Sequence, residues 1–423
     1  MRILMMTNTY SPHVGGVARS VLSFSKALRQ QGHQVLVVAP TFAGQPAHEE
    51  GVLRWPALHR FHHSDFSMPL PAVVGLHARL RQFAPQIVHS HHPFLLGDTA
   101  LRVAAERSLP VVFTHHTMYE RYTHNLPLNS DRISRFATEL ATGYCNLCTA
   151  VIAPSATLAD CLRRRGVEVP IEVIPTGIDL QRFATGEGAR CRQQHAIPAK
   201  ALLLGYLGRL APEKNLGFLA AAVADFLCQR PQAHFLLAGE GSERASLLQH
   251  FSAAGVAGRI HTLGVLPSKE LADAYRAMDV FVFASQSETQ GLVLAEAMAA
   301  GTPVVAVDAP GVREIVRDGE NGRLLPTECS ESFVAALTWL ADLPPATRRN
   351  LSEGALCSVQ EFSLEKSVAR LENFYAKLIS APCRLHLDRN RWTVWRQRFE
   401  EEWKIAHNIA LALKPARRHR HGE

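Results

Sequence analysis

The sequence lacks a long hydrophobic segment. No apolar run approaches the roughly 18 residues that a membrane-spanning helix requires. The apolar stretch at residues 1–7 is too short for a secretory signal and runs directly into Tyr10-Ser11-Pro12. We therefore expect a cytoplasmic protein, and we expect any contact with a membrane to be peripheral, on its inner face.

The sequence also lacks the ligand patterns of common metal and cofactor sites. Only Cys145 and Cys148, among eight cysteines, form a CxxC pair, so buried free thiols are expected rather than a zinc site. The histidine-rich segment 89–93 has no carboxylate or cysteine at ligand spacing, which favours loop packing. A GxGxxG motif with a following acidic residue, as a nicotinamide cofactor requires, is missing as well. We expect no metal and no resident cofactor.

Length and charge leave several classes of partner open. The 423 residues, 47% of them hydrophobic, are enough for two or three domains with large cores. The formal net charge of +7 suits phosphorylated substrates, anionic lipid or nucleic acid, and a mildly basic enzyme explains it equally well. Aromatic stacking platforms are not interleaved with basic residues in the body of the chain, so we expect no nucleic-acid partner.

Short apolar runs alternate with helical patterns twice along the chain, and the rhythm restarts after residues 175–179. Such alternation predicts parallel sheets covered by helices. We therefore predict an α/β protein with two doubly wound, Rossmann-like domains facing a cleft, because ligands bind beyond the carboxyl ends of such strands. The predicted strands are 3–6, 34–39, 87–89, 111–114, 151–153, 202–207, 233–237, 259–262, 280–283 and 304–307. The predicted helices are 17–30, 71–83, 95–106, 131–148, 215–229, 243–254, 271–277, 292–300 and 330–340.

Residues 285–303 carry most of the functional information. Glu288 lies in a loop after a strand, Gly291 allows a ligand to approach the backbone, and the next helix carries Glu296. Backbone N–H groups and the positive end of this helix then point to one spot, which favours a diphosphate. The two carboxylates can accept hydrogen bonds from sugar hydroxyls. The segment predicts a nucleotide-sugar site; a surface acid at Glu288 and an ordinary helix acid at Glu296 are the alternative.

Two cationic side chains follow the first strand of the second half. Arg209 offers a planar fork for phosphate oxygens, and Lys214 offers a compact charge. Both are expected at the carboxyl end of a strand, where a leaving diphosphate needs neutralising. A solvated turn with incidental charges is the alternative.

The first half carries glycine and histidine motifs at strand ends. Gly15 and Gly16 precede a helix and would let a phosphate or sugar approach the backbone, although a plain tight turn is equally consistent. His115 and His116 follow the strand 111–114, and one of them should point into the cleft, with Tyr119 adding aromatic surface.

The segment from residue 384 onward is a basic tail with aromatic residues. This pattern is typical of a helix that lies on an anionic membrane surface, but packing on the protein itself or on a second subunit is equally consistent. The apolar residues at helical spacing are Trp392, Trp395, Phe399, Trp403, Ala406, Ile409 and Leu413.

Together these motifs resemble the retaining glycosyltransferases of family four, which have the GT-B fold. The resemblance covers roughly residues 1–380 and stops before the tail. It rests on Gly15-Gly16, residues 174–179, Gly208-Arg209-Leu210 with Lys214, the pair Glu288 and Glu296, and Gly301-Thr302-Pro303. Residues 116–120 and 287–291 look like those of diacylglycerol glucosyltransferases, although many relatives have Phe in place of Gln290.

The resemblance implies a role for each matching residue. Arg209 and Lys214 would bind the donor diphosphate, and Glu296 would bind the ribose hydroxyls. The sugar and phosphates would be held by Glu288 and the backbone of Thr289, Gln290, Gly291, Leu292 and Val293, with Gly16 lining the phosphate or acceptor pocket. The residues implied in catalysis are His116, Arg209, Lys214 and Glu288. The residues implied in acceptor binding are Gly15, Gly16, His116 and Tyr119.

The implied reaction moves a hexose, glucose from UDP-glucose, onto a lipid hydroxyl such as that of diacylglycerol at an anionic membrane surface. It retains the anomeric configuration and needs no metal. The alternatives are a soluble sugar, a polysaccharide or phosphatidylinositol as acceptor, and a non-catalytic protein that binds nucleotide sugar or lipid. The implied domains are an acceptor domain at 1–178, a donor domain at 179–362, a returning helix at 363–383 and the tail at 384–423. Neither the resemblance nor the residues specify the oligomeric state.

Overall fold

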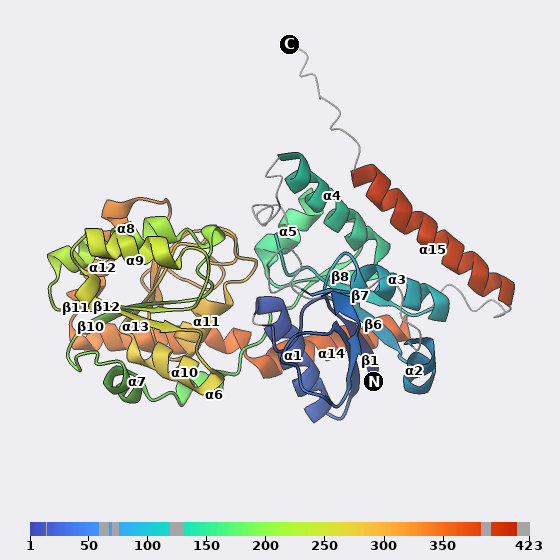
Figure 1. Cartoon of the computed structure of the whole chain (residues 1–423), viewed down its shortest axis with the longest axis horizontal. Helices are drawn as coiled ribbons and strands as arrows, with labels where there is room; N and C mark the ends of the chain where they lie inside the picture. The colour runs from blue at the N-terminus through green and yellow to red at the C-terminus, as the bar shows by residue number, and fades with distance from the viewer. Residues whose placement is uncertain (14, 59–66, 70–75, 119–130, 382–390, 413–423) are drawn as a thin grey trace, which may run out of the picture. The chain divides into compact units, whose positions relative to one another are not determined.

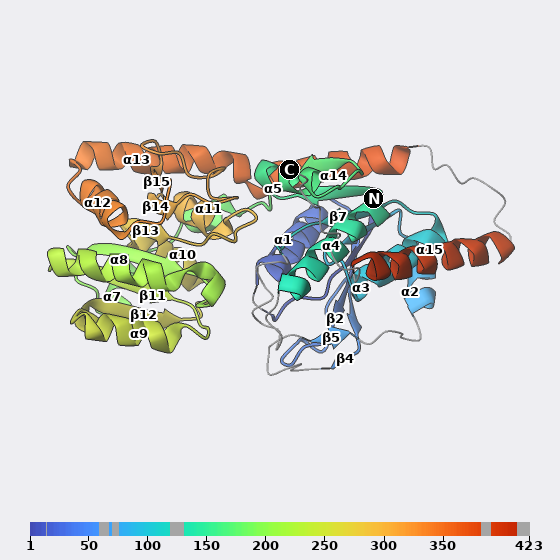
Figure 2. The same cartoon turned by 90° about the horizontal axis from the view of Figure 1, so that it is seen from above.

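Two compact units make up the protein. The computed structural model describes all residues except 14, 59–66, 70–75, 119–130, 382–390 and 413–423. Unit 1 comprises Met1–Ile174 and Val368–Glu423, and unit 2 comprises Pro175–Ser367. Each unit is built on one parallel sheet packed against helices (Figures 1 and 2). The predicted pair of doubly wound α/β domains is thereby confirmed.

Unit 1 has a seven-stranded parallel sheet in the order β3-β2-β1-β6-β7-β8-β9. The chain moves outward from β1 to β3 and then returns to β6 on the other side of β1, so the strand order reverses between β1 and β6. A small antiparallel pair, β4 and β5, lies outside this sheet. The strands are β1 (Arg2–Met6), β2 (Gln34–Pro40), β3 (Val52–Trp55), β4 (Ala57–Leu58), β5 (Met68–Pro69), β6 (Ile87–Ser90), β7 (Val111–Thr114), β8 (Ala150–Ala153) and β9 (Ile171–Val173). The helices are α1 (Gly16–Gln30), α2 (Leu76–Phe83), α3 (Leu96–Arg107), α4 (Asp131–Leu147), α5 (Ala156–Arg164) and, near the end of the chain, α15 (Arg391–Ala412).

Unit 2 has a six-stranded parallel sheet in the order β12-β11-β10-β13-β14-β15. Its strand order reverses between the neighbours β10 and β13. The strands are β10 (Leu202–Leu207), β11 (Ala233–Ala238), β12 (Ile260–Gly264), β13 (Val280–Phe283), β14 (Val304–Val307) and β15 (Gly322–Leu325). The helices are α6 (Leu180–Ala184), α7 (Gly188–Gln194), α8 (Leu216–Gln229), α9 (Arg244–Ala253), α10 (Ser268–Ala277), α11 (Leu292–Ala299), α12 (Ser330–Ala341), α13 (Pro345–Ser358) and α14 (Leu364–Ser380), whose residues from Val368 belong to unit 1. Short 3-10 helices are η4 (Pro212–Lys214), η5 (Ala257–Arg259) and η6 (Val359–Phe362).

An aromatic stack holds the ends of β10 and β13 side by side. The ring of Tyr206 on β10 stacks on the rings of Phe281 and Phe283 on β13, with centroids 6.4 Å apart in each case. All three side chains are almost fully buried. Burying one such side chain contributes about 1.5–3 kcal/mol, so this stack fixes the neighbouring strand ends from which the next residues extend.

Each predicted strand and helix occurs within a few residues of its expected bounds; residues 71–75 of the predicted helix 71–83 lie outside the described ranges. The prediction missed the edge strands β3, β9 and β15, because their partly exposed residues include charged ones and do not form an apolar run. Cys145 and Cys148 are buried free thiols, as predicted. No helix in the described ranges combines the length and the apolar character needed to cross a membrane.

Candidate active site

The first group of predicted residues lies at the carboxyl ends of β10 and β13. Arg209 follows β10 after a single glycine, and the loop after β13 leads through Glu288 to α11. Neighbouring strands at which the strand order reverses send their chains to opposite sides, and the opening between them is where ligands of such sheets bind. The sheet of unit 2 therefore places these residues where its topology favours a ligand.

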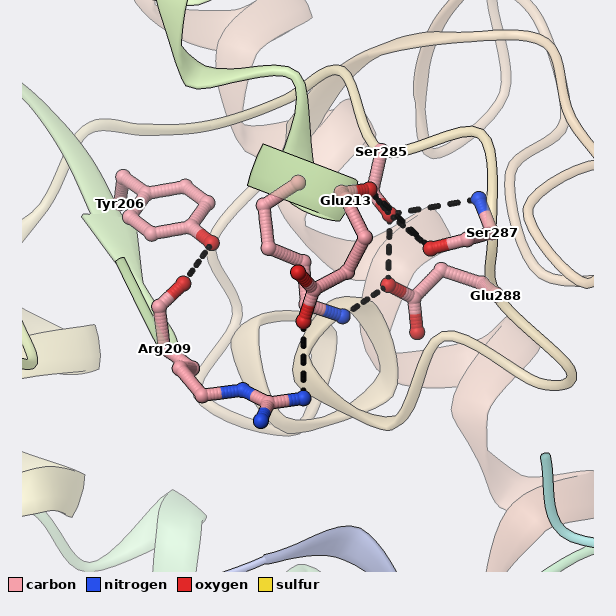
Figure 3. Close-up of polar contacts among 7 residues, drawn as sticks. Tyr206, Arg209, Glu213, Ser285, Ser287 and Glu288 are labelled. Atoms are coloured by element: carbon pink, nitrogen blue, oxygen red, sulfur yellow. Dashed lines mark hydrogen bonds and ion pairs between the residues drawn. The ribbon is translucent and has the colours of Figure 1, made fainter. Parts of the chain in front are cut away.

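Two ion pairs form at this point (Figure 3). The Lys214 ammonium donates a hydrogen bond to Oε1 of Glu288 at 2.6 Å, and the Arg209 guanidinium lies 2.8 Å from Oε1 of Glu213. The hydroxyl of Ser285 donates to the same Glu288 oxygen at 2.8 Å. The helix η4 carries both Glu213 and Lys214, so this single turn provides the partner of Arg209 and the partner of Glu288.

The two cations differ in how much solvent reaches them. The Arg209 side chain is 54% exposed, whereas Lys214 and Glu288 are each 15% exposed. Burial by itself raises the pKa of Glu288, but the charge and hydrogen bond of Lys214, the Ser285 hydroxyl and Arg209 together lower this pKa below its usual value. Glu288 is therefore ionised at neutral pH. A phosphate oxygen can reach Arg209 directly, while Lys214 is already engaged with a carboxylate.

The loop from Glu288 to Gly291 is held in one shape. The Gln290 side chain is buried; it accepts a hydrogen bond from the Thr176 backbone N–H at 2.7 Å and donates to the Thr176 carbonyl at 2.9 Å. A Cβ atom on Gly311 would lie 2.8 Å from the backbone nitrogen of Gln290 and 2.9 Å from the backbone carbonyl oxygen of Glu288. The loop therefore packs on a residue that must be glycine. Because Thr176 occupies the Gln290 side chain, only the Gln290 backbone can contact a nucleotide-sugar donor.

Gly291 turns this loop into α11. Its φ of 72° is in the left-handed region that glycine adopts without strain, and it forms the N-cap of the helix. The first N–H groups of a helix have no partner within the helix, so those of Leu292 and Val293 can face an anion. Glu296, one turn further, is only 2% exposed and accepts a hydrogen bond from the Tyr275 hydroxyl at 2.8 Å. Its contact with a ribose stays a prediction.

In unit 1, the glycine motif lies where α1 begins, beyond the end of β1. A Cβ atom on Gly16 would meet no described atom within 4 Å, so the space beside this residue is open. A Cβ atom on Gly15 would come within 3.3 Å of Nε2 of His13. Open space beside Gly16 fits a ligand and a plain turn equally, so the role of Gly15 and Gly16 stays a prediction.

A cluster of histidines occupies the ends of β6 and β7 in unit 1. Nδ1 of His89 lies 2.5 Å from the Tyr375 hydroxyl, and its Nε2 lies 2.6 Å from the Thr114 hydroxyl. Nδ1 of His91 lies 3.0 Å from Nε2 of His116. Nδ1 of His92 accepts a hydrogen bond from the Asn8 backbone N–H at 3.0 Å. These rings pack within the protein, as expected for residues 89–93.

Burial keeps these histidines neutral. It lowers the pKa of His89 and of His92 to about 3, and it lowers the pKa of His91 and His116 well below the usual range, with further lowering by the neighbouring histidines. A neutral imidazole has one N–H and one lone pair, so it can donate one hydrogen bond and accept another. Within the described ranges, no cluster of three or more His, Cys, Asp or Glu is arranged to bind a metal. Tyr119 lies outside the described residues.

Comparison with known proteins identifies the family. The description Glycosyltransferase Family 4 matches residues 14–182, and Glycosyl transferases group 1 matches residues 189–356. The alpha-monoglucosyldiacylglycerol synthase of Streptococcus pneumoniae is 30% identical over 392 residues, which cover 90% of this chain and 86% of that protein. The chain is a family-four glycosyltransferase. The predicted family is thereby confirmed, and retention of the anomeric configuration fits this family.

Other relatives of this glycosyltransferase have names that specify different substrates. The GDP-mannose-dependent alpha-mannosyltransferase of Corynebacterium glutamicum is 29% identical over 400 residues, covering 92% of this chain and 91% of that protein. The solved structure of a sucrose-phosphate synthase from Thermosynechococcus elongatus aligns with a TM-score of 0.75 at 23% identity, covering 90% of this chain and 100% of that one. This likeness agrees with the predicted GT-B fold.

Sequence reasoning missed several residues of the candidate site. Glu213 stands four residues after Arg209, and Ser285 stands three residues before Glu288, so their spacing offered a weak signal. Tyr275 and Gly311 offered none, because each reaches the site only through the packing of another element. The predicted cations and acids were the visible part of a larger hydrogen-bonded set.

We predict that Lys214→Ala destabilises unit 2 of the glycosyltransferase as well as slowing transfer. The change leaves the largely buried Glu288 carboxylate without its cation, and breaking a buried pair costs about 3–5 kcal/mol, with the lower end expected at 15% exposure. Urea unfolding read by hydrogen exchange of unit 2 peptides measures this loss. The double variant Lys214→Met with Glu288→Gln removes both charges and should regain stability but not activity. An unchanged unfolding midpoint in Lys214→Ala would contradict a structural role for the pair.

We also predict that unit 1 loses stability in mild acid. His89 and His92 titrate near 6.5 in the unfolded chain but near 3 in the folded unit, so between these values only the unfolded chain takes up their protons. The free energy of unfolding is then constant above about pH 6.5 and falls below it by about 1.4 kcal/mol per pH unit for each histidine.

Hydrogen exchange in urea at about pH 7.5, 6.5 and 5.5 tests this pH dependence. Unit 2 is the comparison for the size of the effect: partial burial also lowers the pKa of His234 and of His261, but none of its four histidines is fully buried, so its stability should fall less. Equal stability of unit 1 at all three pH values would show that these histidines are not buried in the neutral form.

Proposed function

We propose that this glycosyltransferase moves a hexose, glucose from UDP-glucose, onto the hydroxyl of a membrane lipid such as diacylglycerol. The relative in Streptococcus pneumoniae carries the name of a glucosyldiacylglycerol synthase and aligns over most of both chains. The motifs at residues 116–120 and 287–291 resemble the same group. A GDP-mannose-dependent relative at similar identity makes mannose from GDP-mannose the second candidate donor.

One observation carries the donor half of the proposal. Arg209, the Lys214–Glu288 pair and the first turn of α11 gather at the strand ends where the sheet of unit 2 reverses its order. Fixed cations and free N–H groups at such a point suit the diphosphate of a nucleotide sugar. Arg209, Glu213, Lys214 and Glu288 sum to zero charge, so a bound diphosphate has to draw on the exposed guanidinium and the helix end.

The proposed chemistry relies on stabilising the leaving group. As the bond from the sugar C1 to the diphosphate oxygen breaks, negative charge grows on that oxygen. The Arg209 guanidinium and the start of α11 stabilise this charge, while Lys214 holds Glu288 in place. One preplaced donor of this kind lowers the barrier by about 2.7–4 kcal/mol. The lipid oxygen attacks from the face that the diphosphate leaves, and a departing phosphate oxygen takes the acceptor proton, which retains the configuration at C1.

His116 is proposed to bind a hydroxyl of the donor sugar. Its neutral ring can exchange one hydrogen bond with the sugar while His91 fixes its orientation from 3.0 Å away. A neutral partner suits a sugar better than a charged one, since it neither attracts a second anion nor repels the developing positive charge on the sugar ring. Gly15, Gly16 and Tyr119 remain the proposed acceptor residues.

We predict that Arg209→Gln lowers turnover by about 100-fold while the protein stays folded. The side chain is 54% exposed, so its loss removes a cation from the site and little packing. Arg209→Lys should recover part of the rate, because it restores the charge but not the planar fork. Arg230→Gln is the matched control: its ion pair with Asp342 is also exposed and lies before β11, at the opposite end of the sheet. Equal rates for Arg209→Gln and Arg230→Gln would reject the assigned role.

Mass spectrometry of lipids tests the complete proposal. Cells that express the protein should accumulate a hexosylated diacylglycerol, and cells with Arg209→Gln should accumulate much less of it. Purified protein should transfer label from UDP-glucose, but not from GDP-mannose, to diacylglycerol in mixed micelles. Transfer from GDP-mannose alone would change the donor, and transfer only to soluble sugars would reject the lipid acceptor.

A further inference from the structure

The helix α15, outside the resemblance to the family, is an integral part of unit 1. It lies along α3 and α4 (Figure 1). Its inward side chains at Glu401, Ile405 and Ala412 are buried, and Ile405 joins the hydrophobic core of the unit. The helix therefore has a fixed inner face and, as a result, a defined outer face.

Polar contacts fix the rotation of α15 about its axis. The Arg102 guanidinium on α3 holds both carboxylate oxygens of Glu402, at 2.5 and 3.0 Å. The Asn408 amide donates to the Leu140 carbonyl on α4 at 3.2 Å. A Cβ atom on Gly143 would lie 1.7 Å from Oδ1 of Asn408, so the two helices approach more closely than any larger residue permits. Several polar residues of α15 are thus used on its inner side.

The outer face of α15 carries exposed hydrophobic residues next to the polar Lys404 and His407. Trp403 points away from the inner residues and is 66% exposed, the largest exposed fraction among the large hydrophobic residues in the described ranges. Ala406 and Ala410, at helical spacing from it, are exposed as well. In the sequence, Phe399, Trp395 and Trp392 precede Trp403 by four, eight and eleven residues, a spacing that keeps to one side of an α-helix.

In the sequence, positive charge gathers in the same segment. Residues 391–423 contain eight Lys and Arg against four Glu, so they carry +4 of the formal net charge of +7. Two of the four acids are directed to the unit itself, because Glu401 is buried and Glu402 pairs with Arg102. Lys404 pairs with Glu401, so the seven other basic residues of the segment stand against the two acids Glu400 and Glu423, and the remainder is positive.

We propose that the outer face of α15, centred on Trp403, docks the enzyme on an anionic lipid bilayer. Trp prefers the headgroup level of a membrane, where its ring is buried and its N–H stays hydrated. Basic residues beside it gain from the negative potential of anionic lipid. A second copy of the chain fits less well, because two faces of like charge would meet. The inference rests on the proposed function for its purpose, since a bilayer face brings the enzyme to a lipid acceptor.

Co-sedimentation of the full-length protein with vesicles tests the docking face. Binding to phosphatidylglycerol-containing vesicles should exceed binding to pure phosphatidylcholine and should fall with added salt. Trp403→Ser should weaken binding by about tenfold, the loss of one buried aromatic anchor. Val265→Ser is the matched control, because Val265 is a 58% exposed hydrophobic residue of unit 2 and its loss should leave binding unchanged.

Two further readouts separate this inference from the proposed function. Transfer to a short-chain diacylglycerol dissolved in detergent should be the same for Trp403→Ser and wild type, since docking is not needed there. Normal vesicle binding by Trp403→Ser would overturn the docking face even if lipid transfer is confirmed. A dimer in light scattering that Trp403→Ser dissociates would also overturn it, in favour of a second copy. If the wild-type protein binds vesicles but transfers sugar to no lipid, the proposed function alone is rejected.

Discussion

The ion pair between Lys214 and Glu288 is the contact on which the rest of the candidate site depends. It joins η4, which follows β10, to the loop that follows β13, and so ties together the two chain segments that leave the reversal point of the sheet. Ser285 adds a hydrogen bond to the same carboxylate. Because both ions are largely removed from solvent, neither is easily replaced by water, so the pair holds these two segments together.

The two units carry different chemistry at the ends of their strands. Unit 2 gathers full charges that compensate one another, which suits a ligand that brings its own negative charge. Unit 1 gathers histidine rings that burial holds neutral, which suits hydroxyl groups and gives no strong electrostatic field. Both arrangements occupy strand ends, and the one in unit 2 lies where its sheet reverses its strand order. The two sheets thus provide one candidate site with charged side chains and one with neutral side chains.

Much of this architecture could be predicted from the sequence, because buried parallel strands read as apolar runs and helices as periodic ones. Val280–Phe283 and the cations after Leu207 were visible for that reason. Glu213 was not, since its importance comes from a partner four residues away and from burial that no local pattern reveals. The bonds of Gln290 to Thr176 link residues 114 positions apart, and such a contact exists only in three dimensions.

The tail shows a different limit of sequence reasoning. Its aromatic and basic residues left membrane contact and packing on the protein as equal alternatives. In the structure the helix packs through Ile405 and Ala412 and leaves Trp403 outside, so one side of the helix satisfies the second alternative and the other side remains open to the first. Helical spacing alone could not reveal which side would face inward, because the inward side is polar in several positions.

Gly311 has a consequence for anyone who wishes to alter donor choice in this enzyme. The loop that presents Glu288 rests its backbone on a hydrogen atom, more than twenty positions downstream, where every other amino acid would carry carbon. A library that keeps Gln290, Gly291 and Gly311 therefore keeps the backbone of this loop, because all three hold its shape. Randomising Gly311 would instead reshape the loop from a position outside residues 288–291.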